Sequence, residues 1–231
     1  MTTLGVDGCR GGWLGISHNS KSMDWQLATS LDALLSSTRA SRIFIDIPIG
    51  LSTTGHRECD TAARRKLGRG FSSSVFTPPA RASLGAQNYP DANTLNRTHS
   101  GKGLSKQSYY LFPKIREADE WLQASVGSPL QVREAHPEVA FMAINGAPLQ
   151  HKKKTVAGFN ERLDLLAGLD VQVAQLADNI LATTRRREIA ADDVLDACCL
   201  ALMPLAGRLR TLPAQPTRDA CGLAMEICYF D

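Results

Sequence analysis

Five acidic residues stand where predicted strands end or a predicted helix begins, a pattern typical of a carboxylate metal site. Asp7 interrupts the apolar run LGVDGC, Asp46 closes the β-branched run IFID, and Glu134 ends the segment VRE. Asp193 and Asp196 are three residues apart in DDVLDACCLAL, which places both on one face of a helix. Neighbouring carboxylates repel one another unless a cation lies between them, and hard cations such as Mg²⁺ or Mn²⁺ prefer oxygen ligands. Two such ions roughly 4 Å apart could activate a water and stabilise the leaving oxygen of a phosphodiester.

Each carboxylate also has an ordinary structural explanation. Asp7 could hydrogen-bond within a β-turn, Asp46 could cap the turn before Pro48, and Asp192 or Asp193 could be the N-cap of a helix. These explanations stay open for each residue taken alone. The joint occurrence of the acids in this order of elements favours the metal site.

Several basic side chains lie in the segments that link the acid-bearing strands, where they could neutralise phosphate charge. Arg81 is the leading candidate because the prolines before it would hold its loop stiff. In the hairpin after Asp7, Gly8, Gly11 and Gly12 would leave backbone room for a phosphate. The candidates for substrate contact are Arg10, Arg81, Lys102, Lys106 and Lys114.

Two histidines invite a chemical interpretation. His136 follows Glu134 closely and could act as a general base, a metal ligand or a substrate contact, or it could hydrogen-bond the start of its own helix. His56 and Cys59 are spaced to be neighbours on a helix, which suggests a thiol hydrolase. No third orienting group or oxyanion turn accompanies that pair, so the thiol reading ranks low.

The elements that must position the acids read as an α/β fold. An antiparallel meander is predicted over 4–9, 12–18 and 24–29, followed by a short helix with Ser30 as its N-cap. The run over 43–51 then predicts a buried strand that is stopped by Pro48 and Gly50. This order predicts a mixed five-stranded sheet in which the meander leads into parallel strands. The remaining elements are a helix at 56–68, a long loop containing Pro78 and Pro79, a helical insertion at about 88–125, a strand ending near 134, helices after 137 and over 160–167, 171–183 and 191–205, and a late edge strand at 222–230.

Composition narrows the class of protein. With 231 residues, 43% of them hydrophobic, the chain can bury the core of one full domain. No apolar run approaches the roughly 20 residues of a membrane helix, so we expect no membrane association and a cytoplasmic location. The six cysteines form no C-x-x-C pair, which argues against a zinc knuckle or a disulfide framework. A net charge of +3 is only weakly basic, and the basic runs at 64–66, 152–154 and 185–187 could hold phosphates or be solvated faces.

Motifs along nearly the whole chain resemble the family labelled domain of unknown function 429. They are GVDGCRGGW, FIDIPIGL, RECDTAARRKLG, SSVFTPPAR, GLSKQ, FPKIREAD, REAHPEVAF, HKKKTVAGFNERLDLL and DDVLDA. The resemblance implies an RNase H-like fold, a single domain over 1–231 carrying the helical insertion, and nuclease activity.

Within that superfamily, the D-x-x-D-A opening of the last helix resembles Holliday-junction resolvases. The resemblance implies that Asp7, Asp46, Asp193 and Asp196 bind metal, with Glu134 where related proteins carry a further acid. The resolvases usually have glutamate in the fourth strand, and the shorter Asp46 would change the metal spacing. Resolvase-like proteins are often dimers, so a homodimer is one expected assembly, although no heptad or exposed apolar strand predicts an interface.

Three functions follow from these patterns. The leading hypothesis is a nuclease that hydrolyses DNA or RNA with Mg²⁺ or Mn²⁺. The second is a non-catalytic nucleic-acid or protein-binding module that keeps the fold. The third is a nucleotide-phosphate enzyme of the actin and sugar-kinase type, which the absence of an internal repeat argues against.

Overall fold

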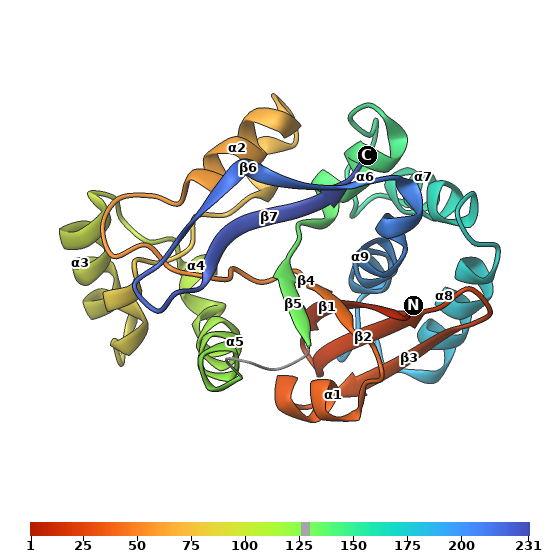
Figure 1. Ribbon diagram of the computed structural model, residues 1–231, viewed down its shortest axis with the longest axis horizontal. Coiled ribbons are helices and arrows are strands. Elements are labelled where there is room, and N and C mark those ends of the chain that lie inside the picture. Colours follow the sequence, from red (N-terminus) through yellow and green to blue (C-terminus); the bar gives the residue numbers. More distant parts are fainter. Residues whose placement is uncertain (126–129) are drawn as a thin grey trace. The chain divides into compact units, whose positions relative to one another are not determined.

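Five strands form one mixed sheet in the computed structural model (Figure 1). The strands β1 (Thr3–Cys9), β2 (Gly12–His18) and β3 (Met23–Ala28) make the expected antiparallel meander. The parallel strands β4 (Arg42–Ile45) and β5 (Gln131–Glu134) extend it beyond β1, in the order β3-β2-β1-β4-β5. This α/β sheet, flanked by helices, confirms the predicted fold class and is consistent with an RNase H-like fold.

The structure describes residues 1–125 and 130–231, which divide into two compact units. The first unit comprises the described parts of 1–46, 127–210 and 228–231 and contains the whole sheet. The second comprises the described parts of 47–126 and 211–227.

Helices cover both faces of the sheet in the first unit. The helix α1 (Leu31–Ser37) is capped by Ser30, as predicted, and packs its leucines against β2 and β3. On the other face α9 (Ala191–Leu202) lies against β1 and is buried from Val194 to its end. A Cβ on Gly5 would lie 2.2 Å from the carbonyl oxygen of Ala197, so only glycine allows this approach of strand and helix. The other helices of this unit are α6 (Pro137–Asn145), α7 (Val156–Ala167) and α8 (Gln172–Thr183).

The second unit is largely helical. Its helices are α2 (Glu58–Leu67), α3 (Tyr89–Ser100), α4 (Lys106–Tyr110) and α5 (Phe112–Ala124), with 3₁₀ turns at Ser72–Ser74 and Arg81–Gly85. The break after α3 falls at the predicted SGKG turn, where Gly101 adopts the left-handed conformation. No helix in residues 1–125 and 130–231 is long and apolar enough to span a membrane.

Several element boundaries differ from the prediction. The strand predicted from 43 to a stop at Pro48 ends at Ile45, and the helix predicted from His56 begins at Glu58. The helix predicted from 160 begins at Val156, and the one predicted to run to 205 ends at Leu202. The prolines at 213 and 216 conceal β6 (Leu209–Arg218), because proline lacks the N–H that a strand donates. The expected late strand exists as β7 (Ala224–Phe230) but pairs with β6, and touches the main sheet through the isolated parallel bridge Ala135–Cys228.

Candidate functional site

Asp7 and Asp46 lie side by side on one face of the sheet. The parallel pairing of β1 and β4 ends with Val6 opposite Ile45, and the amide of Asp46 donates to the carbonyl of Val6 at 2.9 Å. Because side chains alternate along a strand, Asp7 shares the face of Gly5, which packs on α9. The sheet therefore presents both carboxylates towards α9.

The first turns of α9 add two further carboxylates. Asp193 accepts a hydrogen bond from the amide of Ala190 at 2.8 Å, so one of its oxygens serves the start of the helix, although the N-cap itself is Ala190 and not Asp192 or Asp193. Asp196 is only 2% exposed, and its Oδ2 accepts from the Nζ of Lys153 at 2.6 Å. Its Oδ1 is buried without a hydrogen-bond partner among the described residues. Buried carboxylate oxygens are seldom left unsatisfied, so this atom marks a place for a further positive group.

Lys153 supplies the positive charge within this cluster. Its Nζ lies 2.6 Å from Asp196 and 3.6 Å from Asp192. Burial alone would lower the pKa of Lys153, but Asp196, Asp7 and Asp46 raise it above its ordinary value, so the side chain stays an ammonium. The turn before α7 fixes its position, because Thr155 both accepts from the amide of Gly158 and donates to the carbonyl of Lys152.

The carboxylates compete for this one charge. Burial, followed by Asp46, Asp196 and Asp193, raises the pKa of Asp7 well above its ordinary value. Burial and then Asp196 raise the pKa of Asp46 to about 7, although Lys153 opposes the change. The pKa of Asp193 is also raised, mainly by burial. The four aspartates therefore form a site of excess negative charge, which we call the carboxylate cluster: Asp7, Asp46, Asp193 and Asp196.

The fifth predicted acid is not brought to this face. Glu134 pairs with Ile45, and Ile45 pairs with Val6, so all three side chains lie on the sheet face opposite the carboxylate cluster. The acid that reaches the cluster from this segment is Glu138 in the first turn of α6, which raises the pKa of Asp46. Sequence reasoning missed it, although its place just after a strand was a usable signal.

A buried arginine holds Glu138. Arg162 of α7 is 1% exposed and donates to both carboxylate oxygens of Glu138, at 2.7 and 2.9 Å. It also donates to the carbonyl oxygens of His151 and Gly158 and lies over the ring of Phe141. Nothing in the sequence pattern pointed to this pair, because its partners are far apart along the chain.

The predicted substrate-contacting residues belong to both units. Arg10 is exposed in the turn between β1 and β2. Arg81, in the second unit, is held by Asp119 at 2.8 Å and by Asp219. Lys102 follows α3, and Lys106 and Lys114 lie on α4 and α5, also in the second unit.

The two histidines lie just before the first residues of helices. His136 occupies the N-cap position of α6, yet its side chain makes no capping hydrogen bond there. His56 is exposed and precedes α2, whereas Cys59 is buried within that helix, so the two do not share a helical face. This arrangement gives the thiol-hydrolase reading no support.

The chemistry of the carboxylate cluster fits a hard divalent cation. All of its donors are oxygens, its net charge is negative, and Asp196 offers an unsatisfied buried oxygen. Among the described residues, no three acidic, histidine or cysteine side chains are arranged closely enough to hold a metal ion. The positive group bound at the cluster in this structure is the ammonium of Lys153.

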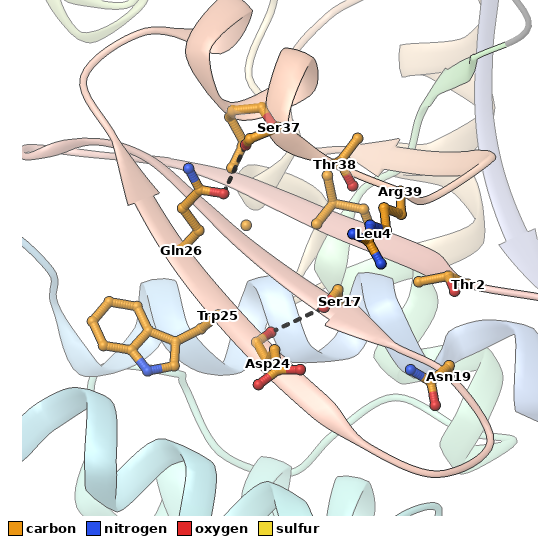
Figure 2. Close-up of a pocket in the computed structure, with 12 residues that line it drawn as sticks. Thr2, Leu4, Ser17, Asn19, Asp24, Trp25, Gln26, Ser37, Thr38 and Arg39 are labelled. Carbon is orange, nitrogen blue, oxygen red and sulfur yellow. Dashed lines mark hydrogen bonds between the residues drawn. The ribbon is translucent and has the colours of Figure 1, made fainter.

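Among the described residues, the hollows of the first unit include one of about 370 Å³ on the α1 face, lined by Leu4 and Leu34 (Figure 2). Ser37 donates to Gln26 at 2.8 Å beside it. None of the predicted site residues lines it. Another, of about 670 Å³, includes Lys153 and Asp192 in its wall and adjoins the carboxylate cluster.

Comparison with known proteins gives one match. A family model described as "Protein of unknown function (DUF429)" matches residues 5–218. Neither the curated proteins nor the solved structures include a match to this chain.

Proposed function

This chain belongs to the DUF429 family, and from that premise we propose that it is a divalent-metal-dependent nuclease acting on DNA or RNA. The observation that carries the proposal is the buried, unpartnered Oδ1 of Asp196 at a cluster whose neighbouring carboxylates add to burial in raising the pKa of Asp7 and of Asp46. A buried excess of negative charge costs stability and is retained where it serves a function. Binding of a divalent cation would satisfy both the charge and the open oxygen.

Asp7, Asp46, Asp193 and Asp196 would hold Mg²⁺ or Mn²⁺ after the ion has displaced the ammonium of Lys153 and drawn the carboxylates closer together than they are in the metal-free arrangement. When bound, such ions lower the pKa of water and stabilise the leaving oxygen of a phosphodiester. Lys153, once released from Asp196, would keep its ammonium near the cluster, where it can neutralise a substrate phosphate. Glu138 would remain paired with Arg162 and would keep its negative charge near Asp46, whose pKa it raises.

A cleavage screen tests the proposal. Purified protein would be incubated with labelled single strands, duplexes, four-way junctions and RNA, in Mn²⁺, Mg²⁺ or EDTA. We expect metal-dependent cleavage that is lost in Asp7→Asn and Asp196→Asn and retained in the control Asp178→Asn, which changes an exposed acid of α8. Cleavage that persists in Asp7→Asn or in EDTA would contradict the proposal.

One observation favours a second candidate, a non-catalytic nucleic-acid or protein-binding module. The ammonium of Lys153 already neutralises part of the cluster, so the fold has a metal-free means of keeping its acids. If this candidate is right, Asp7→Asn leaves partner binding intact and no metal supports cleavage.

The expected homodimer is a separate proposal. The molecular mass of the wild-type protein in solution, measured by light scattering, would test it.

A further inference from the structure

The hollow of about 670 Å³ beside the carboxylate cluster is formed by three segments of the first unit. Its wall combines the turn before α7, the end of α8 and the start of α9. We call it the α7–α9 pocket, after the two helices whose N-terminal ends meet there. Its volume falls within the range of pockets that enclose small organic ligands, about 300–1,000 Å³.

Two cationic side chains in the pocket wall are available to bind a ligand. Lys154 and Arg186 are exposed, and within the described part of the chain neither forms an ion pair or a side-chain hydrogen bond. Lys153, in contrast, is bound to Asp196. The pocket therefore offers an anionic ligand two uncommitted positive groups.

The rest of the wall is largely apolar. Ile189 is 1% exposed, Phe159 and Leu181 are half-buried, and Val156 is 80% exposed. An exposed valine and an aromatic side chain beside cations suit a ligand with a flat apolar face and a negative group. A nucleotide has both, whereas an isolated phosphate would leave the apolar wall unused.

The pocket is continuous with the proposed catalytic cluster. Lys153 and Asp192 line it, and the Nζ of Lys153 is 2.6 Å from Asp196. We propose that the α7–α9 pocket binds an unpaired nucleotide of a single-stranded nucleic acid, so that the adjoining phosphodiester reaches the carboxylate cluster. This proposal rests on the proposed nuclease function for that cluster. Single strands are favoured because bases in a duplex are stacked and cannot present a face to the apolar wall.

Binding without metal isolates the pocket from the chemistry. Fluorescence anisotropy in EDTA would measure the affinity of the protein for a labelled single-stranded oligothymidylate of about 12 nucleotides and for a labelled duplex of equal length. We expect Lys154→Glu/Arg186→Glu to weaken single-strand binding about 10-fold or more, and Phe159→Ala to weaken it about 5-fold or more. The control Lys21→Glu/Arg39→Glu makes the same change in net charge at two exposed positions outside the pocket and should stay within about 3-fold of wild type. Each variant's thermal unfolding shows whether it is folded.

The outcomes separate this inference from the proposed function. The inference is overturned if folded pocket variants bind the oligothymidylate as wild type does. It is also overturned if wild type binds the duplex as tightly as the single strand and the pocket substitutions weaken both to the same extent. Metal-dependent cleavage would in that case still stand. If the pocket variants lose binding but no metal supports cleavage by wild type, the nuclease proposal fails and single-strand recognition stands.

Discussion

Replacing Asp46 by asparagine should stabilise the metal-free protein, although it removes a proposed metal ligand. Burial and the negative charge of Asp196 raise the pKa of Asp46 from 3.8 to about 7. A pKa difference of one pH unit corresponds to about 1.4 kcal/mol, so an ionised Asp46 would cost folding at most about 4 kcal/mol. Asp46 is only half-buried and asparagine has its own polar groups to solvate. We therefore expect the free energy of unfolding at about pH 8 to rise by about 1–3 kcal/mol.

The pH dependence gives the sign of the effect. Between about pH 4 and about pH 7 the folded chain keeps a proton on Asp46 that the unfolded chain releases. The stability of the metal-free wild type should therefore fall as the pH rises through this window. Asp46→Asn lacks this contribution, so its advantage should be near zero at about pH 4 and should grow up to about pH 8.

Urea unfolding in EDTA at several pH values measures this difference directly. Asp178→Asn is the matched control, because it removes the same charge from an exposed position on α8 and should change stability by less than about 0.5 kcal/mol. The reasoning is refuted if Asp46→Asn lowers stability at about pH 8, or if its effect does not vary with pH.

Three further predictions concern the ion pairs and the packing around the cluster. Lys153→Met should lower the free energy of unfolding of the metal-free protein by about 1–2 kcal/mol, a small value because the lysine side chain is 35% exposed. The same substitution should raise the affinity for Mn²⁺ measured by calorimetry, because no ammonium has to be displaced. A lower affinity would contradict that displacement. Gly5→Ala should lower stability by about 2 kcal/mol or more in urea unfolding, because its Cβ would lie 2.2 Å from the oxygen of Ala197, and wild-type stability would show that the contact relaxes. Arg162→Met should lower the free energy of unfolding by about 3–5 kcal/mol, because it leaves Glu138 buried without its partner. Adding Glu138→Gln should recover part of that stability. If it recovers none, the broken ion pair is not the cause of the loss.

The sheet and the four aspartates could be predicted because short-range patterns determine them. Alternation along a strand fixes the face of Asp7, and the three-residue spacing of Asp193 and Asp196 fixes their face on a helix. The pairing of the two strands then brings Asp46 beside Asp7. Each of these steps depends on residues close together in the sequence or on the usual right-handed crossover.

The misses depend on register and on long-range contacts. Glu134 is one position out of register with the face of the cluster, and a shift of one residue moves a side chain to the opposite side of a sheet. Lys153 reaches Asp196 across 43 positions of sequence, and its basic run reads as an ordinary solvated loop. Arg162 is buried with Glu138, an environment that composition gives no reason to expect for arginine.

Calorimetric titration of Mn²⁺ into metal-free wild type, Asp196→Asn and Asp178→Asn tests the central claim most directly. Asp196 carries the buried oxygen that has no hydrogen-bond partner, so replacing this residue by asparagine should abolish or strongly weaken Mn²⁺ binding. The control Asp178→Asn should bind Mn²⁺ as wild type does. Heat of binding in wild type that disappears only in Asp196→Asn is the predicted result. Equal binding by wild type and Asp196→Asn, or no binding to wild type, would contradict a metal site at the carboxylate cluster.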